Sequence, residues 1–299
     1  MKQTFTLICV VVLAAAFIFV LPVQGQTTKK EKKYTIEFSL GLGRVNPQQL
    51  YDRSAGIDEL VSQYAGHYDV SVTSTGEFTQ NKLMIPINLS VTYPLKNKLY
   101  LRAGVEVAFC NSSSEKDFEL DWSQGIQSQL NYTELQHYGL SYKVSYFMPQ
   151  VGGGYHISDA FDVYGSIGLG FTRFTYTEDF SVTMGSDSPQ SETTEYKAHG
   201  TALGVILGAK YGIKISKINA FIKLEAMLLK ATWLKGSRTG AGEDVADGTF
   251  YYYDWNPYLK RTFPYWDVFE TEPATMDKSN VTGMSLNLSS IRILLGISF

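Results

Sequence analysis

The feature that most constrains this chain is an alternation of apolar and polar residues that is kept for ten or more positions in several segments. In LYLRAGVEVAF, residues 99–109, every second residue from Leu99 to Phe109 is apolar, whereas Arg102 and Glu106 lie on the other face. Strands of soluble proteins are usually about five or six residues long, so this pattern predicts unusually long β-strands. We assign eight strands to residues 34–44, 83–94, 99–109, 143–157, 161–176, 198–214, 219–233 and 284–299. In the last strand the apolar positions change parity near Ser289, which predicts a β-bulge there.

The connections between these segments alternate in length. Short turns join the second strand to the third, the fourth to the fifth and the sixth to the seventh. The other connections are long and cover residues 45–82, 111–142, 177–197 and 235–282. A transmembrane β-barrel has short periplasmic turns, long extracellular loops and both termini in the periplasm, whereas a soluble sandwich gives no reason for this alternation. The pattern predicts an all-β fold, an eight-stranded antiparallel transmembrane β-barrel over residues 34–299 with four long extracellular loops.

The chain ends in SSIRILLGISF, whose apolar residues alternate up to the terminal aromatic residue Phe299. In hydrocarbon every backbone polar group must be paired, so we expect this last strand to close the barrel against the first. An alternating final strand that ends in Phe resembles the carboxy-terminal signal of bacterial outer-membrane proteins. Together with the strand count and the loop alternation, it makes residues 34–299 similar to the small OmpA/OmpX-type barrels of the porin family.

This resemblance implies a location in the bacterial outer membrane, with both termini in the periplasm. It also implies two partners, the outer-membrane lipid and the barrel-assembly machinery, which would recognise the C-terminal strand with Phe299 as the assembly signal. We expect a monomer. The longest basic run is KKEKK at residues 29–33, so nucleic acid is not expected as a partner.

The amino-terminal residues have the pattern of a secretory signal peptide. Lys2 is followed by an apolar run from Leu7 to Leu21 and by small residues up to Gly25, which predicts a signal peptide of residues 1–25. Residues 26–33 would then be a short periplasmic segment. An uncleaved membrane anchor is the alternative, but the run is shorter than the roughly 20 residues that a spanning helix needs. After cleavage Cys110 is the one cysteine left, so no internal disulfide is expected.

The inward faces of the predicted strands carry eight charged residues, four of each sign. They are Glu37, Arg102, Glu106, Asp162, Lys210, Lys223, Glu225 and Arg292. The interior of an eight-stranded barrel is just wide enough to be filled by side chains, and charges held away from water need partners. We therefore expect an ion network that fills the barrel. A narrow polar pore for ions or small solutes is the alternative, because the many inward glycines could equally make room for water.

Catalytic chemistry has little support in the sequence. His67 precedes Tyr68 and Asp69 in one predicted loop, and His137 follows Ser112–Ser114 and Asp121 in another. A base and a nucleophile could meet there at the extracellular rim. Such residues are common in loops and none of their spacings is diagnostic, so a rim-located lipid-modifying enzyme remains the weaker alternative. We assign no catalytic, metal-binding or cofactor-binding residue and expect no cofactor.

The longest loop, residues 235–282, is rich in aromatic residues and acidic overall. It has five Lys or Arg against eight Asp or Glu. Exposed aromatic residues tend to mark contact surfaces. The candidate contact surface consists of Tyr251, Tyr252, Tyr253, Trp255, Tyr258, Tyr265 and Trp266. Either these side chains bind an extracellular ligand or partner protein, or they pack on the loop itself as a lid. The sequence thus favours a non-enzymatic barrel that supports the envelope or binds at the cell surface.

Overall fold

A computed structural model describes residues 34–123, 131–215, 218–240, 242, 244–258 and 261–299. The described part contains fourteen β-strands, all joined by antiparallel pairing, and one α-helix. The chain is therefore an all-β protein, as the alternating pattern predicts. The predicted signal peptide and the segment of residues 26–33 lie outside the described residues. Among the described residues, no helix is both long enough and apolar enough to cross a membrane.

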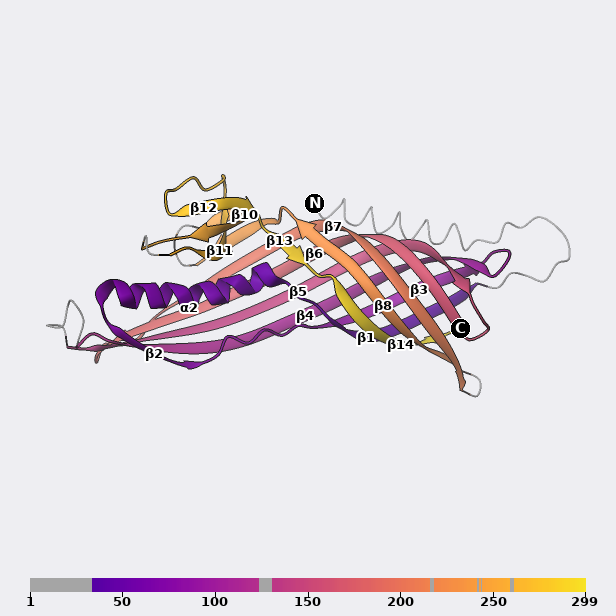
Figure 1. Ribbon diagram of the computed structural model, residues 1–299, viewed down its shortest axis with the longest axis horizontal. Coiled ribbons are helices and arrows are strands. Elements are labelled where there is room, and N and C mark those ends of the chain that lie inside the picture. The colour runs from indigo at the N-terminus through magenta and orange to yellow at the C-terminus, as the bar shows by residue number, and fades with distance from the viewer. Residues whose placement is uncertain (1–33, 124–130, 216–217, 241, 243, 259–260) are drawn as a thin grey trace.

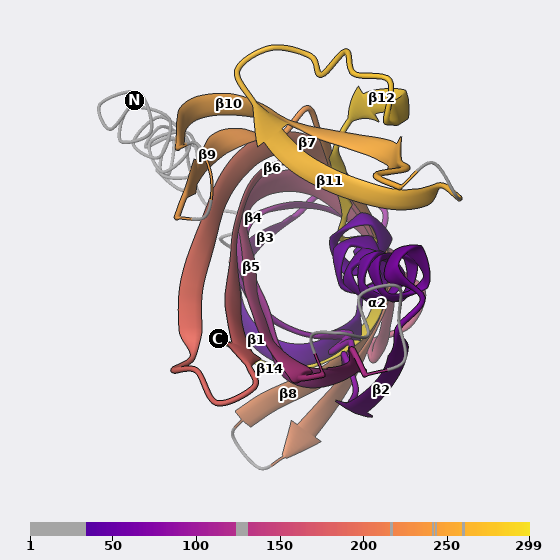
Figure 2. The ribbon, with the colours of Figure 1, turned by 90° about the vertical axis from the view of Figure 1, so that its left-hand side faces the viewer.

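Eight of the strands form a ring (Figures 1 and 2). They are β1 (Thr35–Arg44), β3 (Leu83–Pro94), β4 (Leu99–Asp121), β5 (Thr133–His156), β6 (Phe161–Met184), β7 (Gln190–Ile215), β8 (Ile218–Thr232) and β14 (Ser290–Ser298). Each strand pairs with the next from β1 through β3 to β8. Strand β14 pairs with β8 on one side and with β1 on the other, so the pairings return to their starting point.

The wall of this ring has reversed polarity. Outward side chains are apolar and exposed, as Leu203 at 69% and Ile291 at 70% illustrate. Inward side chains include charged residues that are almost fully buried, such as Lys223 and Arg292 at 1% each. Because side chains alternate across a strand, each strand contributes to both surfaces.

The strands β4, β5, β6 and β7 are longer than the sequence pattern indicates. Much of the predicted loops 111–142 and 177–197 belongs to them, since β4 continues to Asp121 and β6 to Met184. In these extensions the outward side chains are polar, and the buried positions carry residues such as Phe118 and Tyr138. The alternation continues there with its apolar face turned inward, so the segments no longer show the pattern of the first part of the strand.

The predicted bulge near Ser289 is wrong. Strand β13 (Ser285–Asn287) and β14 pair with β8 in the same register, with Asn287 opposite Lys230 and Ser290 opposite Met227. Even-numbered residues point inward throughout. The apparent change in parity arises because the interior is apolar at Leu288 and the outer surface is apolar from Ile291 onward. The ladder is interrupted only locally, where the Leu229 N–H donates to Ser289 Oγ at 3.1 Å.

The long strands extend beyond the ring as a half-open wall, which further elements close (Figure 2). These are the helix α2 (Gln48–Tyr68) and the strands β2 (Ser71–Gly76), β9 (Lys235–Thr239), β10 (Val245–Trp255), β11 (Phe263–Phe269) and β12 (Lys278–Gly283). Strand β2 pairs with β4, β9 with β7, and β10 with β9, β11 and β12. Helix α2 contacts β11 on one side and β2 on the other. We call this assembly, with the outer parts of β4–β7, the cap; residues 45–82 and 235–282 therefore hold regular structure where the sequence suggests loops.

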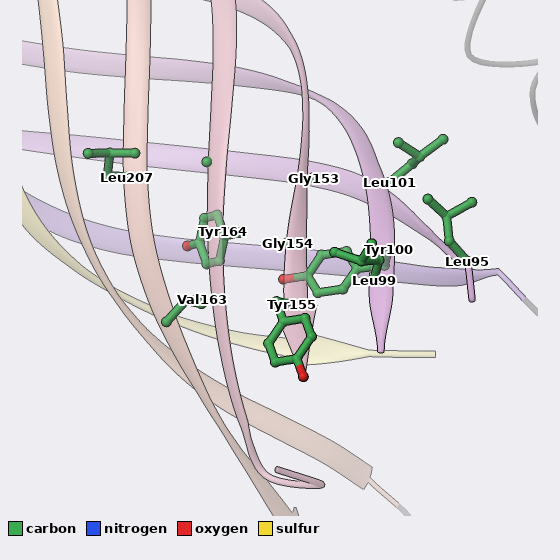
Figure 3. A pocket seen from close by; sticks show the side chains of 11 residues that line it. Leu95, Leu99, Tyr100, Leu101, Gly153, Gly154, Tyr155, Val163, Tyr164 and Leu207 are labelled. Atoms are coloured by element: carbon green, nitrogen blue, oxygen red, sulfur yellow. The ribbon is translucent and has the colours of Figure 1, made fainter. Parts of the chain in front are cut away.

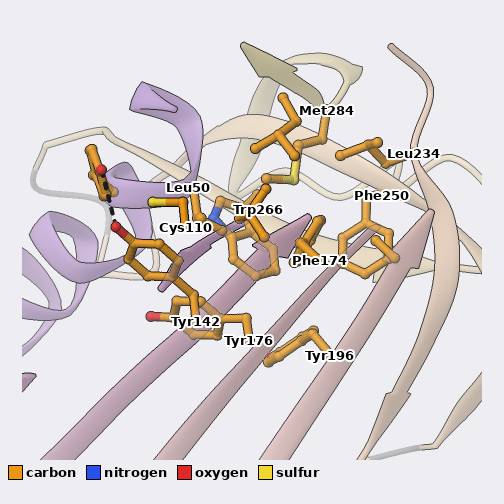
Figure 4. Packing of buried hydrophobic residues seen from close by; sticks show 14 of the residues in the cluster. Leu50, Cys110, Tyr142, Phe174, Tyr176, Tyr196, Leu234, Phe250, Trp266 and Met284 are labelled. Atoms are coloured by element: carbon orange, nitrogen blue, oxygen red, sulfur yellow. Dashed lines mark hydrogen bonds between the residues drawn. The ribbon is translucent and has the colours of Figure 1, made fainter. Parts of the chain in front are cut away.

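A largely aromatic core fills the cap (Figure 4). Phe174 and Tyr196 of the long strands pack against Phe250 and Trp266, which β10 and β11 contribute. Leu50 of α2 belongs to the same core and is 1% exposed. The cap is thus a packed body rather than a set of independent loops.

Candidate functional site

The interior of the ring holds all eight predicted charged residues. Seven of them are at most 5% exposed, and the Lys210 side chain is 18% exposed. Since four are acidic and four are basic, their formal charges cancel. The contacts divide them into two groups of four.

The first group is centred on Arg292 of β14. Its guanidinium donates two hydrogen bonds to Glu106, at 2.5 and 2.8 Å, and one to Glu225 at 2.6 Å. Tyr146 also donates to Glu106, at 2.6 Å. This two-pronged contact between Arg and a carboxylate is the strong, geometrically specific form of ion pair. It connects β14, β4 and β8 across the ring.

Arg102, the fourth member of this group, is less completely paired. Its Nη1 lies 4.0 Å from Glu225, its Nη2 donates to Asn88 at 3.1 Å, and its guanidinium sits 4.4 Å from the Tyr164 ring centre. Its Nε and Nη1 have no hydrogen-bond partner, and the same holds for both amide atoms of Gln150. Buried polar groups in folded proteins are normally satisfied by protein or ordered water. This part of the interior therefore contains polar atoms of the kind that ordered water satisfies in folded proteins.

The second group lies around Glu37 of β1, which accepts hydrogen bonds from Lys210 and Lys223 at 2.8 Å each. Lys210 also pairs with Asp162 at 2.7 Å. His156 contacts the other oxygen of Asp162 at 2.5 Å. Each carboxylate in this group faces at least one ammonium group, so the charges neutralise one another locally.

Two interior tyrosines are seated against glycines of neighbouring strands. A Cβ added at Gly208 would lie 2.5 Å from the Tyr164 ring, and one at Gly154 would lie 2.3 Å from the Tyr100 ring. Glycine is required at both positions because any side chain would displace the ring. Figure 3 shows both rings beside an open apolar hollow of about 490 Å³ in the outer surface of the wall. Its lining residues include no charged side chain, so it offers no polar chemistry.

The cap contains a buried cation that the sequence reading missed. Arg53 of α2 is 4% exposed and donates to Glu178, to the Trp266 carbonyl and to the Tyr196 hydroxyl, at 2.8, 2.7 and 2.5 Å. Its guanidinium also lies 4.5 Å from the ring centres of Tyr196 and Tyr265 and 4.9 Å from that of Trp266. We call this arrangement the Arg53 cage. Burial alone would lower the pKa of Arg53, but Glu178 and the surrounding groups hold that pKa well above its usual value.

The Arg53 cage links four parts of the cap. The cation comes from α2, Glu178 from β6, Tyr196 from β7 and Trp266 from β11. Charged hydrogen bonds and close aromatic faces both stabilise a buried guanidinium. The helix and the β10–β11 hairpin are therefore fastened to the strand wall at one point.

Three of the seven aromatic residues predicted as a contact surface are buried. Tyr253, Tyr265 and Trp266 are 2%, 8% and 0% exposed, so the prediction that they form an exposed surface is wrong. They are buried because the paired strands β10 and β11 pack on the wall and on α2. Tyr251, Tyr252, Trp255 and Tyr258 are partly exposed. The hairpin thus uses its aromatic residues mainly for packing, the lid arrangement that the sequence left open.

The residues considered for a rim enzyme do not come together as a catalytic set. His67 packs edge-on against Tyr68 and lies 5.4 Å from the Tyr258 ring, whereas His137 contacts Asp117 at 2.6 Å. Within the described part of the chain, no three His, Cys, Asp or Glu side chains are placed to hold a metal ion. Cys110 is a buried free thiol.

Phe299 lies at the far end of the ring from the cap. Its backbone exchanges two hydrogen bonds with Ile36, at 3.0 and 3.1 Å, and its side chain is 74% exposed. The terminal residue therefore continues the pairing of β14 with β1. Its aromatic ring points away from the protein, where a partner can reach it.

Comparison with known proteins adds little to this description. No protein-family model matches the chain, and no curated protein sequence matches it. Among solved structures, this chain aligns with the crystal structure of Ail, the attachment invasion locus protein of Yersinia pestis. The alignment covers 89% of this chain and 99% of the Ail chain. The two share 10% sequence identity with a TM-score of 0.32, so this likeness supports no conclusion about function.

Proposed function

We propose that this protein is an integral outer-membrane protein whose ring is an eight-stranded transmembrane β-barrel. The observation that carries the proposal is the reversed polarity of the wall. All eight strands expose large apolar side chains, among them Ile36, Phe38, Leu40, Leu42, Leu89, Leu101, Val151, Ile167, Leu203, Leu224, Ile293 and Leu295. In a soluble protein a continuous apolar band of this kind would face water, which is unfavourable. In a transmembrane barrel the outward side chains face lipid and form such a band.

The length of the band also fits a membrane. On β5 the outward residues from Phe147 to Tyr155 span nine positions, and strands that cross a bilayer need about 9–11 residues. Short connections, residues 95–98 and 157–160, lie at the end away from the cap. In outer-membrane barrels the short turns are periplasmic, and this supports a cap outside the cell and both termini in the periplasm.

We further propose that the protein is a closed, non-enzymatic, monomeric barrel that supports the envelope or displays the cap for surface binding. Two features favour this role over transport. The interior is occupied by paired charges, and the outer mouth is covered by a cap that the Arg53 cage fastens. The partly exposed aromatic residues Tyr251, Trp255 and Tyr258 offer a contact surface for an extracellular ligand or partner protein.

A narrow channel is the second candidate, and one observation favours it. Arg102, Gln150, Ser39 and Ser166 carry buried polar atoms without a partner, which is the chemistry of a water-lined path. Such a path would have to pass between the ion pairs of the interior. A change in conductance after replacement of Arg102 or Glu106 would support this alternative.

The experiment combines heat-modifiable gel migration with conductance in planar bilayers, on the purified chain refolded in detergent. The closed barrel predicts a faster-migrating unboiled band and no conductance steps. Arg102→Ala, which widens the interior where polar atoms are unpaired, is compared with Lys214→Ala at the periplasmic turn. If the wild-type protein shows conductance steps that Arg102→Ala alters and Lys214→Ala leaves unchanged, the channel is supported and the closed barrel is refuted. A boiled and an unboiled sample that migrate alike, with no β-sheet in the circular dichroism spectrum, would refute the barrel.

A further inference from the structure

Basic side chains gather on the outer surface, immediately beyond the apolar band on the side of the cap. They are Lys143 of β5, Arg173 of β6, Lys197 and His199 of β7 and Lys235 of β9, and all five are exposed. We call them the basic cluster. Their outward positions place them on the same surface as the lipid-facing residues.

The pairing register sets these side chains next to one another. Arg173 is opposite His199, and His199 is opposite Lys235. One step further from the band, Lys143 and Lys197 flank Thr175 from its two sides. Neighbouring strands lie about 4.8 Å apart, so the four strands place these groups within a patch about 15 Å wide.

The charges in this patch are of one sign. The remaining positions of the two rows are Ser145, Thr175 and Ser237, which are neutral. On these four strands the first acidic side chain is Glu195, one row further toward the cap, where it pairs with Lys197. On the next strand, β10, the exposed Asp247 lies between the pairs Val245–Arg238 and Gly248–Gly236. An anion bound across the rows would be attracted by the Lys and Arg side chains of both rows, and the neighbouring hydroxyl groups could donate to it as well.

The depth of the cluster identifies the kind of anion. The row below it, toward the band, contains Phe147 and Phe171, whose ring centres are 6.5 Å apart. Aromatic residues of membrane proteins concentrate at the membrane–water interface, and the level just beyond them is that of the lipid headgroups. Basic residues at this level bind anionic headgroups.

We propose that the basic cluster binds the phosphate groups of a lipid in the outer leaflet of the membrane. This proposal rests on the proposed membrane placement of the ring. The acyl chains of such a lipid would lie along the apolar residues of β5–β7, below Phe147 and Phe171. Its phosphate groups would reach Lys143, Arg173 and Lys235.

The test measures binding of two lipid probes to the full chain refolded in detergent. The probes are bisphosphorylated lipid A and the same lipid with its phosphate groups removed. The triple variant Lys143→Gln, Arg173→Gln and Lys235→Gln removes three charges of the cluster. Lys214→Gln, on β7 at the opposite end of the band, is the matched control. Inorganic phosphate is added as a competitor to separate a lipid site from a site for free phosphate.

We expect the wild-type protein and Lys214→Gln to bind the phosphorylated lipid at least about tenfold more tightly than the dephosphorylated one. Each basic group near an anionic surface contributes a factor of roughly ten or less to the affinity, and several such groups act together here. The triple variant should lose this preference. Equal binding of both lipids by the wild type, or a preference that survives in the triple variant, would overturn the proposal, and competition by millimolar phosphate would overturn the assignment to lipid. If lipid binding fails but the unboiled band still migrates faster, only the lipid site is refuted and the proposed barrel stands. If the faster-migrating band is absent, the proposed function itself is refuted.

Discussion

Replacement of Arg292 tests whether the ring interior acts as one ionic unit. Arg292→Met keeps much of the side-chain volume but removes the only group that bonds both Glu106 and Glu225 in the contacts described above. Removing one partner from a buried ion pair costs about 3–5 kcal/mol, because the other charge is left uncompensated. Here Tyr146 still donates to Glu106 and Tyr164 to Glu225, which places the expected loss near the lower limit.

A loss of about 3 kcal/mol in the free energy of unfolding corresponds to a change of roughly 100-fold in the folding equilibrium. The fraction of folded protein is measured as the faster-migrating unboiled band after equilibration of the refolded chain in increasing urea. Lys210→Met is the matched control, because Lys210 bonds two carboxylates but its side chain is 18% exposed at the end of the ring. Its loss should be clearly smaller than that of Arg292→Met, since water can replace the lost contacts.

The double variant Arg292→Met with Glu106→Gln separates charge from packing. If the two groups form one unit, the double variant loses less than the sum of the two single variants, by about 0.5–3 kcal/mol. A single Arg292→Met variant that loses less than about 1 kcal/mol, or a strictly additive double variant, would show that the buried charges do not depend on one another.

Three further predictions concern the cap and the packing of the ring. Arg53→Ala removes charged hydrogen bonds with a typical value of about 1.5–3 kcal/mol each. It should make α2 and the β10–β11 hairpin at least tenfold more susceptible to protease, while the heat-modifiable band is unchanged. Equal protection from protease in the variant and the wild type would show that the Arg53 cage does not fasten the cap. Although burial would raise the pKa of Asp277, hydrogen bonds including one from Trp255 lower it to about 2. Since an unperturbed Asp has a pKa near 3.9, the ionised Asp277 carboxylate stabilises the cap above about pH 4, and this contribution is lost as the pH falls toward 2. Tryptophan fluorescence should show this acid-dependent step in the wild type and not in Asp277→Asn. Gly208→Val should lower the yield of refolded protein by displacing the Tyr164 ring, whereas a refolding yield equal to that of the wild type would show that the ring can move aside.

The ring could be read from the sequence, because its strands keep a strict alternation in which the outward residues are apolar. Residues 83–94 were predicted as a strand and form β3 with those bounds. The outer halves of β4–β7 escaped the prediction because, in the proposed membrane placement, water rather than lipid lies outside them. Their outward positions become polar and their inward positions aromatic, so the same period-two alternation appears with its faces exchanged. Tyr138, Tyr142 and Tyr146 already mark that inner face in the sequence.

Helix α2 shows why the Arg53 cage was harder to predict. Its first residue follows Pro47, no side chain caps its start, and no acidic residue lies in its first turn. The helix is therefore defined mainly by its packing. Its buried positions include Leu50, Arg53, Ile57 and Val61, spaced by three, four and four residues as on one face of a helix. An arginine within such an apolar stripe is costly to bury unless a partner is provided. Its partners Glu178, Tyr196 and Trp266 come from three distant segments, so only the folded chain reveals that this position joins the helix to the wall.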